Sequence, residues 1–202
     1  EMDMLVKSHK KLIITSSYIL FPILTLLYFI SDSLIILILT DKWLEAAGMI
    51  KLLCLASLLH PIHSLNLNLL NIIGRSDLFL KTEIIKKALV IIILIITLNI
   101  SLEAVLIGQI FVSILAFFIN SHYVGTLLNY NAFKQLKDIS KNILSSLILA
   151  LVFYIICDYL SSPLLKILIS SITGVIVYIL ISYIFNLKGF YFIREKLNQL
   201  VK

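Results

Sequence analysis

The chain has 202 residues, of which 60% are hydrophobic and 14% are charged, and its formal net charge is +6. A water-soluble domain of this size does not carry so much apolar surface, and several apolar runs approach the ~20 residues that cross ~30 Å of hydrocarbon. The composition excludes a soluble protein and predicts an all-α polytopic membrane protein. The basic residues are spread over four segments that flank the apolar runs, which argues against nucleic-acid binding.

The first part of the chain, residues 1–123, is predicted to hold four transmembrane helices. A polar lead (1–11) precedes a first span (12–30), which Pro22 is expected to kink. Residues 33–40 are apolar but too short to cross, so we expect them at the membrane interface. The second span begins near Met49 and stops at Gly74, and two further spans follow over residues 78–100 and 104–123.

The second part of the chain is predicted to hold a cytoplasmic amphipathic connector (124–142), two further transmembrane helices (143–186) and a basic cytoplasmic tail (187–202). Ser162 and Pro163 are expected to cap and start the last span. With six spans, both termini lie on the same side of the membrane. Of the 17 Lys and Arg residues, all are then on that side except Lys42, Lys51 and Lys166. This positive-inside bias predicts six spans with both termini in the cytoplasm.

The second span carries many polar side chains, and Pro61 is expected to loosen its backbone by disturbing the carbonyl of Ser57. At 100° per residue most of the polar groups share one face, whereas Asn66 points away from it. A residue count places His60 near the middle of the span. Lipid cannot satisfy these groups, so the face must look into protein or water. We therefore expect a substrate- or cavity-lining role, with hydrogen bonding between helices as the alternative, for His60, His63, Ser64, Asn68 and Asn71.

Thinner polar stripes lie on two other spans, and packing between helices competes with cavity lining as their role. The candidates are Gln109, Ser113 and Asn120 on the fourth span and Tyr18 and Thr25 on the first. A basic segment follows the second span and is expected to contact phosphate or anionic lipid on the cytoplasmic side. Its residues are Arg75, Lys81, Lys86 and Lys87.

Signatures of catalysis and of metal binding are missing from the sequence. It has no H-E-x-x-H, no G-x-S-x-G and no Gly-rich phosphate loop. His60 and His63 lack a third ligand, because His9 and His122 are expected in cytoplasmic-side segments. Cys54 and Cys157 lie in apolar runs and indicate small core residues. We expect no metal, no cofactor and no enzymatic activity.

Two passages carry a family resemblance: FPILTLLYFISDSLIILILTDKW (21–43) and LLCLASLLHPIHSLNLNLLNIIGRSDLFLKTEIIKK (52–87). The shared pattern is a helix with Phe-Pro near its start and a Trp-containing turn after it, then His-Pro-Ile-His, an Asn-rich segment and Gly-Arg-Ser-Asp. This pattern resembles the Wzx-type flippases of lipid-linked polysaccharide, such as O-antigen and capsule translocases, of the multidrug/oligosaccharide-lipid/polysaccharide exporter superfamily. Beyond Lys87 the likeness is limited to hydropathy and loop pattern.

The resemblance implies both a fold and a function. Family members have two lobes of helices around a central cavity, so this chain resembles the C-terminal part of a MATE-like transporter that lacks its N-terminal lobe. A start at Glu1 likewise suggests a piece of a longer protein. The implied function is translocation of an undecaprenyl-pyrophosphate-linked oligosaccharide (an O-antigen, capsule or exopolysaccharide unit) across the bacterial inner membrane. The implied partners are that substrate, membrane lipids, the N-terminal lobe and polysaccharide polymerase machinery.

Other functions stay open at this point. A multidrug or cation-coupled exporter of the same superfamily is expected to carry intramembrane carboxylates, and this half shows none. A membrane-embedded enzyme of envelope-lipid assembly would use the pair of His60 and His63. A third alternative is a non-transporting accessory protein or an inactive remnant.

Overall fold

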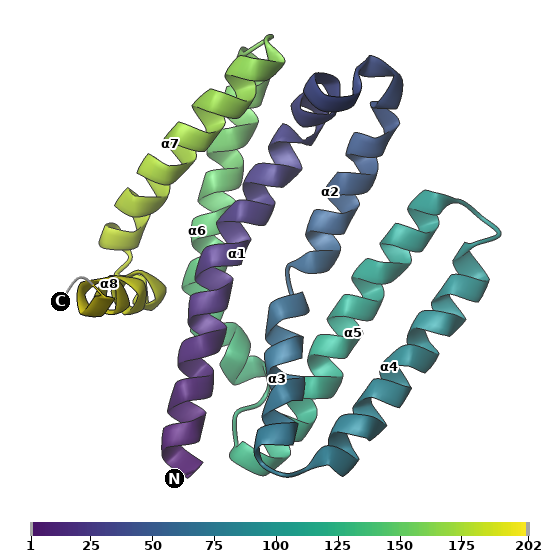
Figure 1. Ribbon diagram of the computed structural model, residues 1–202, viewed down its shortest axis with the longest axis vertical. Helices are drawn as coiled ribbons and strands as arrows, with labels where there is room; N and C mark the ends of the chain where they lie inside the picture. The colour runs from purple at the N-terminus through teal and green to yellow at the C-terminus, as the bar shows by residue number, and fades with distance from the viewer. Residues whose placement is uncertain (1, 201–202) are drawn as a thin grey trace.

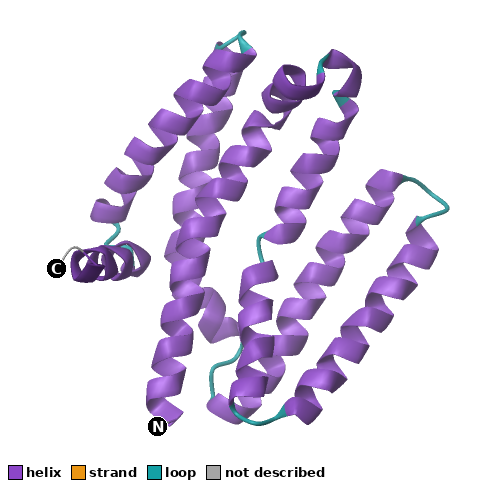
Figure 2. Cartoon of the chain, in the orientation of Figure 1, coloured by secondary structure: helices purple, strands orange, loops and turns teal. Residues whose placement is uncertain are grey.

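The computed structural model describes residues 2–200, and within that range it consists of helices and short connections without a strand (Figure 2). Residue 1 of the predicted lead and residues 201–202 of the predicted tail lie outside this range. The all-α prediction is confirmed. The elements are α1 (Met2–Leu39), η1 (Asp41–Trp43), α2 (Glu45–Ser57), α3 (His60–Ile72), α4 (Ser76–Thr97), α5 (Leu102–Leu128), α6 (Ala132–Tyr159), α7 (Pro163–Ile184) and α8 (Lys188–Leu200).

Within residues 2–200, five segments are long and apolar enough to cross a membrane. They are α1, α5, α6, α7, and α2 together with α3. Their outer faces expose large apolar side chains, for example Leu147, Leu151 and Ile176, as lipid-facing surfaces do. The protein is therefore a polytopic membrane protein. The remaining predicted span, over residues 78–100, is α4, whose 22 residues reach about 33 Å but carry four charged side chains in the first half.

Helix α1 unites three segments that were predicted to be separate. The polar lead, the first span and the interfacial segment form one continuous helix of 38 residues that passes through Pro22. At 1.5 Å per residue this helix is about 57 Å long, well beyond the ~30 Å of a hydrocarbon core. It therefore extends out of the bilayer, and the lead is part of the bundle.

The second predicted span is two helices in the structure. Helix α2 ends at Ser57 and α3 begins at His60, as expected from Pro61, which has no N–H to donate to the carbonyl of Ser57. At its far end α3 stops at Gly74, as predicted. The left-handed backbone of Gly74 (φ 75°) lets the Arg75 N–H donate to the carbonyl of Leu70 at 2.8 Å.

Residues 124–142 do not form a separate connector. Helix α5 continues to Leu128 and α6 begins at Ala132, so three residues join them. Asn129 ends α5 in a left-handed conformation (φ 52°), and the side chain of Asn131 accepts from the Lys134 N–H at 3.1 Å to cap α6. The predicted connector is therefore mostly helical extension of two spans.

The last span begins at Pro163, as predicted, because a first-turn proline lacks only an N–H that would have no helical partner. The predicted cap is wrong in one detail, since the side chain of Ser162 makes no capping hydrogen bond. The tail forms α8, which places Phe190 and Ile193 on a buried cluster of Tyr18, Ile181 and Leu187.

Helix α1 lies at the centre of the bundle and contacts α2, α3, α6, α7 and α8. Beside it, α2 and α3 pack on α5, and α5 carries α4 on the outside, while α8 runs across the direction of the other helices (Figure 1). We call the end that holds the N-terminus, the turn at Gly74 and the connection at residues 129–131 the basic end. The main core lies toward this end and includes Ile13, Ile62, Leu69, Phe117, Val124 and Ile139.

Candidate functional site

The polar face predicted on the second span is divided into a buried and an open part. His63 is only 8% exposed, whereas His60, Asn68 and Asn71 are exposed and Ser64 is half-buried. We call His60, Ser64, Asn68 and Asn71 the α3 stripe. Because their spacing returns to one side of the helix, they form one continuous polar strip that no described helix covers.

The two histidines lie side by side at the start of α3. Their ring centroids are 4.8 Å apart, edge to face, and Ser64 Oγ lies 3.5 Å from His60 Nδ1. His63 Nδ1 is buried and has no hydrogen-bond partner among the described residues, and α3 packs against α4. The two histidines thus lie on the helix that packs against α4, with His60 exposed and His63 buried.

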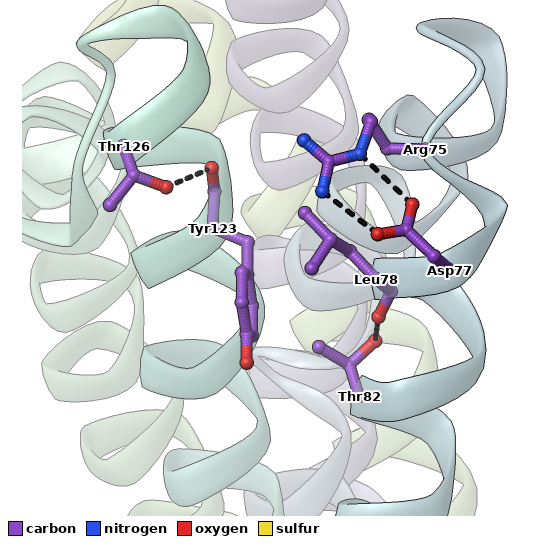
Figure 3. Close-up of polar contacts among 6 residues, drawn as sticks. All are labelled: Arg75, Asp77, Leu78, Thr82, Tyr123 and Thr126. Carbon is purple, nitrogen blue, oxygen red and sulfur yellow. Dashed lines mark hydrogen bonds and ion pairs between the residues drawn. The ribbon is translucent and has the colours of Figure 1, made fainter.

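Two of the four basic candidates are already occupied by carboxylates. Arg75 donates from Nε to Asp77 Oδ1 at 2.9 Å and from Nη2 to Oδ2 at 2.8 Å (Figure 3). The hydrogen-bonding Arg75 guanidinium holds the pKa of the Asp77 carboxyl at about 2. Lys86 forms an ion pair with Oε1 of Glu83. A phosphate group at Arg75 must therefore displace Asp77.

The other two basic candidates are free to meet a ligand. Lys81 and Lys87 are exposed on α4, and within residues 2–200 neither forms an ion pair. They add positive charge on α4, the helix that follows α3, and the α3 stripe itself carries amides, a hydroxyl and an imidazole. Such a surface can donate hydrogen bonds to sugar hydroxyls and attract an anion.

Two further candidates connect helices rather than line an open site. Tyr18 shares a hydrogen bond with Ser182 of α7 at 2.9 Å, and its carbonyl accepts from the Tyr178 hydroxyl at 2.6 Å. Asn120 of α5 donates to the carbonyl of His63 at 2.7 Å. For these residues the packing alternative describes the structure.

The remaining candidates lie away from the α3 stripe. Thr25 and Ser113 line a cavity between α1, α2, α5 and α6, and Gln109 is half-buried on α5. The polar residues predicted on three spans therefore do not converge on one chamber within this chain. Comparison with protein-family models, curated proteins and solved structures finds no match.

Within residues 2–200, no three His, Cys, Asp or Glu side chains are placed to hold a metal ion. Of the two cysteines, Cys54 is buried on α2 and Cys157 is half-buried on α6. The polar groups at the start of α3 thus form a histidine pair beside an ion pair, and hydrogen bonding and charge are the chemistry they offer.

A buried polar network at the basic end was missed by the sequence analysis. Asn66 Oδ1 lies 2.9 Å from His9 Nε2, and Asn66 Nδ2 donates to Gln135 Oε1 at 2.7 Å and to Ser121 Oγ at 3.0 Å. The Gln135 amide also donates to the carbonyl of Tyr130 at 3.1 Å. The network joins α1, α3, α5 and α6. Its partners are far apart in sequence, so no local pattern could have shown it.

Proposed function

We propose that this chain is one half of a membrane transporter that carries an undecaprenyl-pyrophosphate-linked oligosaccharide across the bacterial inner membrane. The observation that supports this function is the α3 stripe, in which polar side chains lie uncovered on a membrane-spanning segment. Such groups need hydrogen-bond partners from water, a substrate or a second lobe. A transporter with a central cavity supplies all three.

In this proposal the α3 stripe lies at the mouth of the transporter's central cavity, near the membrane surface, rather than at the centre of the bilayer. Helix α8 is amphipathic, exposes Arg194 and Lys196, and lies across the bundle beside Tyr18, as an interfacial helix does (Figure 1). His9 is hydrogen-bonded to Asn66, so the residues of α3 extend from about the level of α8 toward the basic end. His60 then lies near the membrane–water boundary, although a residue count puts it in mid-membrane.

This depth suits the uptake of a polar head group. The basic end faces the cytoplasm by the positive-inside rule, and Lys81 and Lys87 attract the pyrophosphate there. The amides of Asn68 and Asn71 hydrogen-bond the sugar. The missing N-terminal lobe closes the other wall, the lipid tail stays in the bilayer, and the two lobes rock to alternate access. Polysaccharide polymerase machinery then receives the unit, which has not been changed chemically.

Complementation tests this function. The full-length gene, and a variant with His60→Ala, Asn68→Ala and Asn71→Ala, are expressed in a strain that lacks its polysaccharide flippase. The wild type is expected to restore surface polysaccharide, whereas the variant leaves lipid-linked precursor inside the cell at equal protein level. The matched control is Asn198→Ala with Gln199→Ala, two exposed amides on α8 outside the stripe. Normal export by the stripe variant contradicts the proposal.

A further inference from the structure

A cavity of about 550 Å³ lies between α1, α2, α5 and α6, apart from the α3 stripe. Its volume is in the range of small-molecule binding sites. The rim includes Leu55, Ile114, Ile143 and Leu147, which are exposed, apolar and located on membrane-spanning segments. The cavity therefore opens toward hydrocarbon, and its ligand enters from the bilayer.

Two serine hydroxyls in this apolar cavity lack a partner. Ser113 and Ser146 are 9% and 8% exposed and line the cavity, and among the described residues their Oγ atoms have no hydrogen-bond partner. Other hydroxyls of the bundle bond the carbonyl one turn earlier, as Thr25 of α1 does to Phe21 and Ser145 of α6 to Lys141. A buried hydroxyl without a partner is costly, so these two donors indicate an acceptor atom supplied by a ligand.

No charged side chain of the described part of the chain lines the cavity, so the part of the ligand that fills it is uncharged. On α1 and α2, the ionic groups nearest in sequence to the lining residues are Asp32 and Lys51, each one turn beyond them. These two neutralise each other through a contact of 2.5 Å. A charged head group must therefore stay outside, and only its apolar part enters.

The hydroxyls also set the direction in which a ligand lies. The amide of Asn142 donates to the carbonyl of Ile14 and to Ser17 Oγ, and Ser146 follows one turn later on α6, so it lies near the depth of Tyr18. Tyr18 touches α8, the interfacial helix. From there the cavity continues along α1 to Phe29, about 12 Å beyond Phe21. The acceptor thus belongs near the interface and the apolar part points into the bilayer.

We propose that this cavity binds one acyl chain of a glycerophospholipid from the leaflet on the side of α8, whose ester carbonyl accepts hydrogen bonds from Ser113 and Ser146. The ester group of such a lipid is uncharged and lies at the boundary between head group and chain, which matches the position of the two hydroxyls. This site does not depend on the transport function, because occupancy is measured without substrate or transport.

Photolabelling tests the site. The full-length protein is placed in nanodiscs that contain a phospholipid with a diazirine in its sn-2 chain, irradiated, and mapped by mass spectrometry. Labelling is expected to concentrate on cavity residues such as Leu24, Leu58 and Ile110 over outward residues such as Ile176. Leu58→Trp, which fills the cavity, is expected to remove the cavity labels. Equal labelling of cavity and outer surface overturns the proposal.

The role of the hydroxyls has its own comparison, which does not depend on the folding of Leu58→Trp. An ether-linked lipid with the same diazirine chain lacks the carbonyl and is expected to label the cavity about threefold to tenfold less. Ser113→Ala with Ser146→Ala is expected to abolish this difference. The matched control is Ser170→Ala, a buried hydroxyl that also lacks a partner but does not line the cavity. Equal labelling by ester and ether lipids in the wild type overturns the carbonyl contact.

Discussion

Asn66 of α3 and Gln135 of α6 exchange two hydrogen bonds, one in each direction, across 69 residues of sequence. The distances are 2.7 Å and 3.1 Å, and both side chains are fully buried. His9 and Ser121 complete the network from α1 and α5. Four helices are therefore joined at the basic end by side chains whose polar groups satisfy one another.

The first prediction concerns this network. Asn66→Ala leaves the ring of His9 without its partner and takes one hydrogen bond each from the oxygen and the nitrogen of the Gln135 amide. An unsatisfied buried group costs ~1–3 kcal/mol. We expect a clear fall in the thermal unfolding midpoint of the purified protein in detergent. Asn68→Ala removes an exposed amide from the same helix and is expected to cost no more than ~0.5 kcal/mol. Equal shifts for the two variants contradict the network's importance.

The second prediction is a dependence of stability on pH at the connection between α5 and α6. The Tyr130 hydroxyl donates to Asp138 Oδ2 at 2.9 Å, and Lys10 Nζ lies 2.8 Å from Oδ1 of the same carboxylate. Burial, and then the hydrogen bond to Asp138, raise the pKa of Tyr130 far above its ordinary value of 10.0.

A raised pKa means that the folded protein holds the phenol proton more tightly than the unfolded chain. The resulting stabilisation is complete below about pH 10 and is lost as pH rises further. We expect the unfolding midpoint of the wild type to fall more steeply above that pH than that of Tyr130→Phe. Tyr154→Phe, which changes an exposed tyrosine on α6, is the control and keeps the wild-type slope. Identical slopes for all three proteins refute the assignment.

The third prediction concerns the attachment of α8. A Cβ atom at Gly189 would lie well within van der Waals contact of the Tyr18 side chain, at 2.6 Å from its Cγ. Gly189→Ala is therefore expected to displace α8 and to speed proteolysis of the tail. Gly48→Ala adds the same methyl group where nothing lies within 4 Å. Since alanine favours a helix by up to ~1 kcal/mol over glycine, that control should keep or raise stability. A tail equally resistant in both variants argues against the close contact.

The fourth prediction concerns the ion pair between α1 and α2. Asp32 and Lys51 are 48% and 30% exposed, so solvent screens the pair and its coupling is expected to be ~0.2–1 kcal/mol. Lys51→Met should destabilise the protein, and adding Asp32→Leu should recover part of the loss, as a double-mutant cycle of unfolding midpoints would show. Lys42→Met, at an exposed lysine on η1, is the control. Additive effects of the two substitutions would mean that the pair is not coupled.

The local elements of this fold follow from the sequence alone. The apolar runs predict a helical membrane protein, Gly74 ends α3, Pro163 begins α7, and Pro61 accompanies the break between α2 and α3. Each of these features depends on a residue and its neighbours within one or two turns of helix. Dihedral preferences, missing donors and hydrophobicity act over that range, so they can be evaluated without knowing the tertiary structure.

Only the tertiary structure decides which polar side chains are buried. A helical projection relates His60, His63 and Asn66 to one another by angle, but it does not say where the neighbouring helices lie. The structure turns Asn66 and His63 inward and leaves His60 open, and it ties Asn66 to partners on three other helices. The tertiary structure also decides the depth of each residue in the membrane. Helix α1 is longer than the hydrocarbon core is thick, and its contacts with α3 and α8 fix where those two helices lie along it. The physical reason is that burial and depth depend on contacts between distant segments, and a sequence encodes these only through the packing of the whole bundle.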